Sequence, residues 1–214
     1  MNQYIDYKNL IFILYLFNRL KVGGGRMRTA KLFYLFEDDL FKNRIIGPNY
    51  VMKRFQMGPY NPKIATDLRS LGDSRFLSVK EVYYEKIEDL ADIYSYNSNT
   101  NRFLKSIEDL IQENSDIFEK FDFIIDIYAK KSGEELKDII YSLSKTGSKN
   151  QRIIDYSNRS IILDPNKITN PIKNFELTED WYDTIEVLLN PNIYYGIQKG
   201  IRDAQQGNFT NELS

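Results

Sequence analysis

The longest apolar run in the chain is eight residues, from Leu10 to Phe17. A helix needs about 20 such residues to cross a bilayer, so this run predicts a helix buried in a protein core. Apolar residues continue nearly all round from Tyr7 to Leu20, as in a helix enclosed on most sides. Asp6 and Lys8 flank its start and no small-residue cleavage site follows, so we expect no secretory signal and a cytoplasmic protein.

Three consecutive glycines, Gly23 to Gly25, end this helix, because glycine is costly inside helices. A second helix is predicted over 27–42, with a buried stripe of Leu32, Leu35, Phe36 and Leu40. A glycine-rich loop before a helix can bind phosphate at the helix N-terminus. A plain connector is the favoured alternative here, because no phosphate-loop motif is present.

Glu37, Asp38 and Asp39 are adjacent within the second predicted helix. Neighbouring helical carboxylates point in different directions, so we interpret them mostly as solvated surface, with one paired to a basic residue. A magnesium-dependent enzyme would need them to converge with other groups in a pocket, and this stays the least favoured alternative.

A third helix is predicted to begin at Asn61-Pro62, because asparagine is a favoured N-cap and proline suits the first helical position. Gly72 is expected to end it. A short strand over 50–56 and a turn over 57–62 precede it, and a β-hairpin is expected over 76–84. The inward stripe is Ile64, Leu68 and Leu71, and the outward face carries Lys63, Thr66, Arg69 and Ser70.

Two helices, a capped third helix and a hairpin follow the order of a winged helix-turn-helix, whose third helix enters the DNA major groove. We therefore expect a mainly α fold with a small β-hairpin, formed by a winged-helix-like N-terminal part and a helical C-terminal part. The expected divisions are a basic winged-helix-like part (1–90), a helical part completing that domain (91–145), and a linker with C-terminal helices (146–214).

The second half is predicted to be largely helical, over 100–113, 116–129, a helix launched by a Ser132–Glu135 capping box, 178–189 and 192–205. The helix over 116–129 is expected to be buried nearly all round through Phe121, Phe123, Ile124, Ile125 and Ile127. Residues 145–150 read as a polar linker and 151–177 as irregular, with turns at two prolines. Gly207 is expected to end the last helix.

The chain has no histidine and no cysteine. These absences exclude disulfides, thiolate and histidine metal sites, a Ser-His-Asp triad and any side chain that ordinarily titrates near neutrality. We therefore expect a protein that is not an enzyme and that uses no metal and no cofactor.

Charge is distributed unevenly along the chain. Residues 1–80 carry 14 Lys and Arg against 6 Asp and Glu, and residues 81–214 carry 15 against 24. This asymmetry favours a polyanion-binding part joined to a part that does not bind polyanions. The alternative is that the two parts neutralise each other within one fold. The predicted DNA-binding residues are Arg26, Arg28, Lys53, Arg54, Lys63, Arg69 and Arg75.

Three stretches together resemble the Panacea antitoxin family and the related YwgA-like, phage-associated proteins. They are Arg28 to Leu35; Phe55 to Tyr60 with Leu68 and Leu71; and Ile127 to Ser132 with Glu135, Leu136 and Tyr141. The similarity covers about residues 8–145. The tail from Leu189 to Gly207 also resembles antitoxin C-termini, through Gly200, Asp203 and Gly207. The Gly23–Gly25 insertion and the Asn61-Pro62 pair depart from the family pattern.

The resemblance implies an antitoxin that neutralises a cognate toxin by direct contact and binds DNA for autoregulation. The alternative is a DNA-binding regulator or phage-associated accessory protein without a toxin. We expect the toxin and DNA to be partners of the chain, and we expect no membrane association. The sequence leaves open whether the chain forms a homodimer. The last helix offers an apolar face that is either core or a partner-binding arm. The predicted partner-binding residues are Ile193, Ile197, Gly200, Ile201, Asp203 and Phe209.

Overall fold

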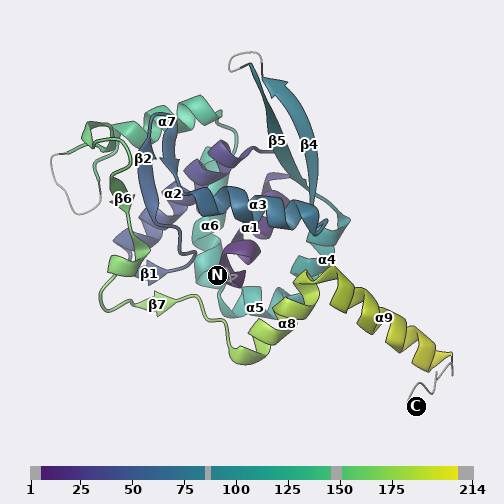
Figure 1. Cartoon of the computed structure of the whole chain (residues 1–214). Coiled ribbons are helices and arrows are strands. Elements are labelled where there is room, and N and C mark those ends of the chain that lie inside the picture. Colours follow the sequence, from purple (N-terminus) through teal and green to yellow (C-terminus); the bar gives the residue numbers. More distant parts are fainter. Residues whose placement is uncertain (1–5, 85–87, 146–150, 207–214) are drawn as a thin grey trace. The chain divides into compact units, whose positions relative to one another are not determined.

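The computed structural model describes residues 6–84, 88–145 and 151–206, and combines 59% helix with several small sheets (Figure 1). The fold is therefore mixed α and β, with more strands than the one predicted hairpin. Contacts divide the chain into two units, Met1–Leu177 and Thr178–Ser214. This division differs from the expected boundaries near residues 90 and 145. No helix in the described ranges is long and apolar enough to cross a membrane.

Helices α1 (Tyr7–Leu20) and α2 (Arg26–Lys42) form as predicted, and the glycine segment between them is fixed by β-pairing. Gly24 exchanges two backbone hydrogen bonds with Tyr94, at 2.8 and 3.1 Å. A Cβ at Gly23 would lie 2.6 Å from Cγ2 of Ile93, so a side chain has no room there. The glycine segment therefore connects the two helices, as predicted, and is held in place at Gly24 by one isolated bridge.

Two short strands precede the third helix: β2 (Met52–Phe55) and β3 (Gly58–Tyr60), which pair antiparallel. The stretch 57–62, predicted as a turn, thus contains a strand. Helix α3 (Pro62–Asp73) begins as predicted, because Oδ1 of Asn61 accepts a hydrogen bond from Lys63 N at 2.9 Å. Gly72 does not end it, since the helix continues to Asp73 and Ser74 is its C-cap.

A long hairpin follows, formed by β4 (Leu77–Tyr84) and β5 (Asp89–Tyr96). The strands pair antiparallel over their whole length, from Leu77 with Tyr96 to Tyr84 with Asp89. Residues 76–84, predicted to contain a whole hairpin, supply only its first strand. The base of the hairpin packs on α1 and α3, and its far end rises beyond the helices (Figure 1).

Helices α4 (Ser98–Ser106), α5 (Glu108–Glu113), α6 (Ser115–Tyr128) and α7 (Gly133–Ser142) come next. The helix predicted over 100–113 is two helices, α4 and α5, separated at Ile107. The Ser132–Glu135 capping box is confirmed by reciprocal hydrogen bonds of 2.7 and 3.2 Å. The prediction that α6 is buried all round is wrong, because Phe123 is 63% exposed and Ile127 is also exposed on its outer face.

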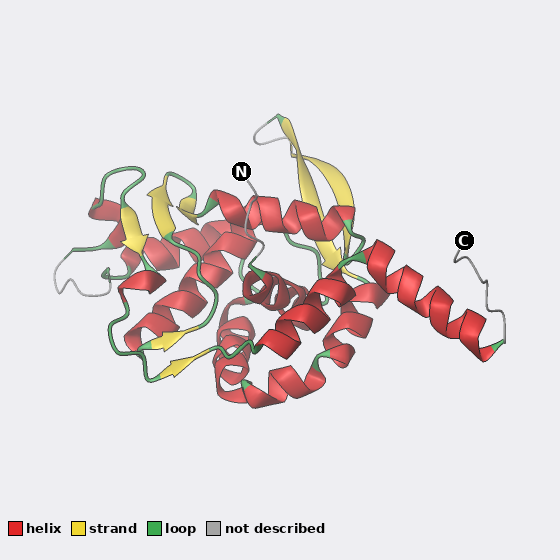
Figure 2. Ribbon diagram, turned by 60° about the horizontal axis from the view of Figure 1, so that its bottom comes forward, coloured by secondary structure: helices red, strands yellow, loops and turns green. Residues whose placement is uncertain are grey.

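The stretch 151–177, predicted as irregular, returns to the first half of the chain. It contains two single-turn helices, η2 (Ile153–Asp155) and η3 (Pro165–Lys167), and two strands, β6 (Ile161–Leu163) and β7 (Lys173–Asn174). Strand β6 pairs with β2 on the edge opposite β3. Strand β7 pairs in parallel with β1 (Ile45–Ile46), beside which it lies in Figure 2. Long-range pairing therefore orders a segment that local sequence leaves undefined.

The second unit contains α8 (Glu179–Leu189) and α9 (Pro191–Gln205), close to the predicted ranges. Thr178 caps α8 through a hydrogen bond from Trp181 N. The side chain of Asn190 caps α9 by accepting from Asn192 N and Ile193 N. The predicted stop at Gly207 and the candidate Phe209 lie outside the described residues.

An aromatic cluster joins α1, α2 and α6 in the core of the first unit. The rings of Phe36 and Phe121 stack with centroids 4.1 Å apart and planes 15° apart. Phe12 contacts both, at 5.6 and 5.9 Å between centroids. Such pairs add packing specificity to the large apolar area that each ring buries.

The two phenylalanines on α6 provide a test of this core. Phe121→Ala should lower the free energy of unfolding by about 3 to 5 kcal/mol, because it removes a fully buried ring and leaves a cavity. Phe123→Ala, on the exposed face, should change it by less than about 0.5 kcal/mol. Urea denaturation of both variants measures the difference, and equal losses would contradict this assignment of the faces.

Candidate functional site

Three of the seven predicted DNA-binding residues make internal contacts. The guanidinium of Arg28 donates to the carbonyls of Ala129 and Gly23. Arg54 lies over the ring of Tyr141, 5.6 Å from its centroid. Lys63 forms a 2.7 Å ion pair with Asp67. These three cations are therefore part of the packing of the first unit.

The Lys63 ion pair belongs to a chain of contacts that fastens α3 to the loop before β2. Asp67 is buried and accepts from Lys63 Nζ and from the hydroxyl of Tyr50, both at 2.7 Å. Burial raises the pKa of Asp67, and the hydrogen bonds from Lys63 and Tyr50 oppose that rise. Lys63 thus neutralises a buried carboxylate, which the helical spacing alone did not reveal.

The remaining four basic candidates are exposed, and two of them, Arg26 and Arg69, lie close enough to Tyr94 for their charges to affect its hydroxyl. Burial is the main cause that raises the pKa of the Tyr94 hydroxyl, and the negative charge and hydrogen bond of Asp92 are the next. The positive charges of Arg69 and Arg26 oppose this rise. Arg26 begins α2 and Arg69 lies on the outer face of α3, so both flank Tyr94. Arg75 occupies the turn before β4 with a φ of 61°, and Lys53 lies apart on β2.

The hairpin presents apolar and acidic groups. Tyr83 and Leu90 are exposed cross-strand partners near its far end, and Val79 and Tyr96 are exposed on the same face. Lys21 lies over the ring of Tyr96, 4.5 Å from its centroid. The two strands carry one basic residue, Lys80, and three acidic residues, Glu81, Asp89 and Asp92. An acidic hairpin repels a phosphate backbone.

The interpretation of Glu37, Asp38 and Asp39 as mostly solvated is wrong for the first two, which are buried. Oε1 of Glu37 accepts from Tyr50 N at 3.0 Å, and Oε2 has no partner among the described residues. Asp38 pairs with Lys42 at 2.5 Å, and Asp39 pairs with Lys120 of α6 at 3.4 Å. The three carboxylates therefore make separate contacts, and the described ranges contain no cluster of acidic groups suited to a metal ion.

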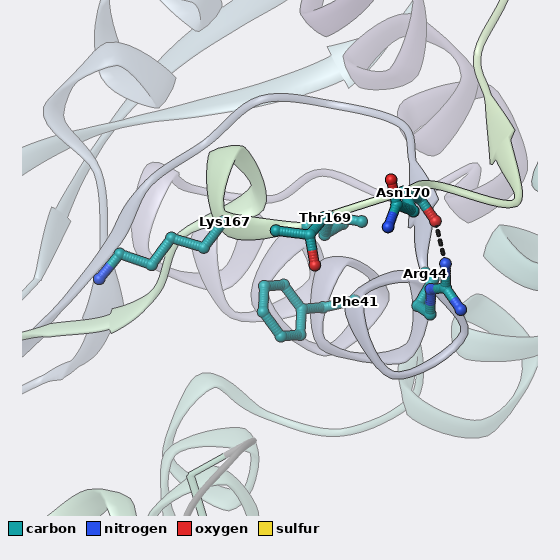
Figure 3. Close-up of a pocket in the computed structure, with 6 residues that line it drawn as sticks. Phe41, Arg44, Lys167, Thr169 and Asn170 are labelled. Carbon is teal, nitrogen blue, oxygen red and sulfur yellow. Dashed lines mark hydrogen bonds between the residues drawn. The ribbon is translucent and has the colours of Figure 1, made fainter.

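A surface pocket of about 410 Å³ lies where η3 and its following turn pass the end of α2. Its lining residues are Phe41, Arg44, Lys167, Ile168, Thr169 and Asn170. Arg44 donates to the carbonyl of Asn170, and Lys167 points to the opposite end, with Phe41 and Thr169 between them (Figure 3). The lining contains no carboxylate to act with these groups, so it does not form an acid–base pair.

The three stretches that carry the family resemblance come together in space. Helix α2 packs against both α7 and β3, and α7 also contacts β3. The hydroxyl of Tyr141 accepts from Gly58 N at 3.1 Å and donates to the carbonyl of Phe55. Lys31 of α2 lies against Gly58, whose φ of 114° suits glycine. The sequence signal for this cluster is a lysine inside the apolar stretch Ala30 to Phe36.

The predicted partner-binding residues of α9 form an exposed stripe. Ile193, Ile197 and Ile201 are 41%, 45% and 46% exposed and recur every four residues on one face. Gly200 is also exposed, with no atom within 4 Å of the position of a Cβ, and Asp203 is partly exposed. Of the two interpretations of this stripe, core or partner-binding arm, its exposure favours the arm.

Glu37 should make stability depend on pH. Burial raises its pKa well above the usual value, against the opposing hydrogen bond from Tyr50 N. Between the ordinary glutamate pKa of about 4.3 and the raised value, the folded state holds a proton that the unfolded chain has released. The protein then loses up to about 1.4 kcal/mol of stability per pH unit through this group as pH rises.

Glu37→Gln removes that loss, so its stability relative to wild type should increase from about pH 5 to about pH 7. Denaturant unfolding across this range measures the two slopes. Glu119→Gln, at an exposed position on α6, is the matched control and should follow wild type. Parallel curves for Glu37→Gln and wild type would show that Glu37 is ionised in the folded state.

No family model matches the sequence, and neither the curated proteins nor the solved structures give a match.

Proposed function

We propose that this chain is an antitoxin-like binding protein that neutralises a cognate toxin by direct contact, with α9 as the contacting element. The observation that carries the proposal is the exposed stripe of Ile193, Ile197 and Ile201. An amphipathic helix of this kind binds partners by placing its apolar face in a hydrophobic groove. Exposed apolar side chains in a row are costly for a protein that never covers them.

Charge supports a partner with a basic surface. Within the second unit, residues 178–206 carry five acidic against two basic residues, and the first turn of α8 contains Glu179 and Asp180. Opposite charges around an apolar contact speed association and select the partner. We therefore infer a toxin whose hydrophobic groove is rimmed by lysine or arginine.

A single substitution on α9 tests the proposal. Ile197→Asp should weaken binding to the toxin encoded beside this chain by at least about tenfold, because it places a charge in the apolar contact. Calorimetry on the purified pair measures the affinity, and co-expression measures the loss of protection from the toxin.

Lys199→Ala, two residues along the same helix, is the control for α9 and should bind as wild type does. Circular dichroism should show the same helix content in both variants. Wild-type affinity in Ile197→Asp would refute α9 as the contacting element. No association between the wild-type chain and the neighbouring gene product would refute the antitoxin function.

DNA binding is a second candidate, favoured by the order of elements in the first unit. We propose that α1, the Gly24 bridge, α2, α3 and the β4–β5 hairpin form a winged helix with β1–β3 inserted before α3. The bridge between Gly24 and Tyr94 supports this, because it adds a third β segment to the hairpin at its base. The acidic hairpin does not suit backbone contact, so phosphate contacts would come from Arg26, Arg69 and Arg75.

The two basic residues on the face of α3 should respond differently to substitution. Arg69→Gln should weaken DNA binding and reduce the salt dependence by about 0.9 in the log–log slope, because it removes one exposed phosphate contact. Lys63→Gln should mainly lower stability, because it leaves Asp67 buried without its cation. Fluorescence anisotropy over a salt series, together with denaturant unfolding, separates these effects. A DNA affinity that does not change with salt concentration would contradict the proposed DNA-binding function.

A further inference from the structure

One face of the β4–β5 hairpin presents apolar side chains to solvent in its outer half. Val79 pairs with Tyr94 and Tyr83 with Leu90, and these four side chains point to the same side of the two strands. Tyr94 is buried, whereas Val79, Tyr83 and Leu90 are 47%, 57% and 52% exposed. A Cβ at Gly72 would lie 2.6 Å from Cγ2 of Val79, so α3 packs against the base of this face. The outer half extends beyond the helices (Figure 1).

Two carboxylates lie directly opposite each other among these apolar side chains. Glu81 pairs with Asp92 in the strand register, between the Val79–Tyr94 and Tyr83–Leu90 pairs, and both acidic side chains are exposed. Like charges at directly opposite positions of adjacent strands destabilise a sheet. The acid pair therefore lowers the stability of the hairpin unless a cation lies between the two carboxylates.

No cation within the described ranges forms an ion pair with either carboxylate. Lys80 lies on the opposite side of β4, because successive residues of a strand point to opposite faces. The charges of Arg26 and Arg69 act on the Tyr94 hydroxyl, which donates a 3.3 Å hydrogen bond to Asp92. The space between the two carboxylates therefore suits a cation supplied by another molecule.

We propose that Val79, Glu81, Tyr83, Leu90 and Asp92 bind a segment of a partner protein that carries lysine or arginine between apolar side chains. The cation lies between the two carboxylates, and the apolar neighbours cover Val79 on one side and Tyr83 with Leu90 on the other. Alternate residues of a strand are about 7 Å apart, so an extended segment with apolar, cationic and apolar side chains at i, i+2 and i+4 matches this spacing.

Charge decides between the occupants of this face. The carboxylates repel a phosphate backbone, and a second copy of the chain placed face to face would bring two more carboxylates to the same contact. A basic, apolar segment meets both the charge and the exposed apolar area. None of these residues belongs to α9, so the proposal does not depend on the antitoxin function.

A synthetic peptide, acetyl-Leu-Leu-Arg-Arg-Leu-Leu-amide, tests the face, because in extended form it presents leucine, arginine and leucine on each side. Amide NMR of the full-length chain should show saturable shifts at Glu81 and Asp92. The same peptide with glutamate in place of arginine should bind at least about tenfold more weakly. Glu81→Gln combined with Asp92→Asn should cause a similar loss for the arginine peptide. Lys80→Gln, on the opposite side of β4, should bind as wild type does.

The repulsion between the two carboxylates can be measured without any ligand. Glu81→Gln should raise the midpoint of thermal unfolding by about 1 to 3 °C, because it removes one charge of the opposed pair. Glu119→Gln, an exposed position on α6, is the matched control and should leave the midpoint unchanged.

Three results would overturn the proposal: unsaturable shifts, equal affinity for the two peptides, or an unchanged midpoint in Glu81→Gln. Shifts at Glu81 and Asp92 that depend on protein concentration without peptide would also overturn it, because they would assign the face to a second copy of the chain. No toxin or DNA takes part in these measurements, so failure here is distinct from failure of the antitoxin function.

Discussion

The enclosure of α2 is the constraint on which the first unit depends. This helix contacts α3, α6, α7, β1, β3 and β6, so elements from distant parts of the sequence all pack on it. Its buried residues include Lys31, Glu37 and Asp38 as well as the apolar stripe. Buried polar and ionisable side chains are costly in a low-dielectric environment unless they have hydrogen-bond or ion-pair partners. Glu37 accepts a hydrogen bond from the backbone amide of Tyr50, Asp38 pairs with Lys42, and the side chain of Lys31 lies against Gly58.

Much of the helical structure was predictable because its signals are local. Apolar periodicity located α1, α2 and α6, and side-chain caps located the starts of α3 and α7. The strands were harder, because their pairing is not local. Strands β6 and β7 contain three and two residues, and their partners lie more than 100 positions earlier. The second strand of the hairpin was missed because apolar residues alternate poorly between Asp89 and Tyr96.

The candidate sites were less predictable than the fold, because charge counts do not say which charges are free. The excess of basic residues before position 80 is real, yet Lys63 neutralises Asp67 and Arg28 donates to backbone carbonyls. Burial likewise separates Glu37 and Asp38 from Asp39, although the three are adjacent. In contrast, the face of α9 followed directly from isoleucines four residues apart. Local sequence determines which face of a helix is apolar, whereas the elements packed around a charged side chain determine whether it is exposed, buried or paired.

Pairing of β6 with β2 has a consequence for synthesis of the chain. Until Ile161 to Leu163 leave the ribosome, the outer edge of β2 carries unpaired backbone amides and carbonyls. The nascent chain therefore holds most of its helices beside an open strand edge, which is a template for intermolecular association. Pairing of β6 with this edge therefore competes with pairing of the edge to a strand of another polypeptide. Slow translation after residue 145 would extend the time during which the edge is open to the other polypeptide.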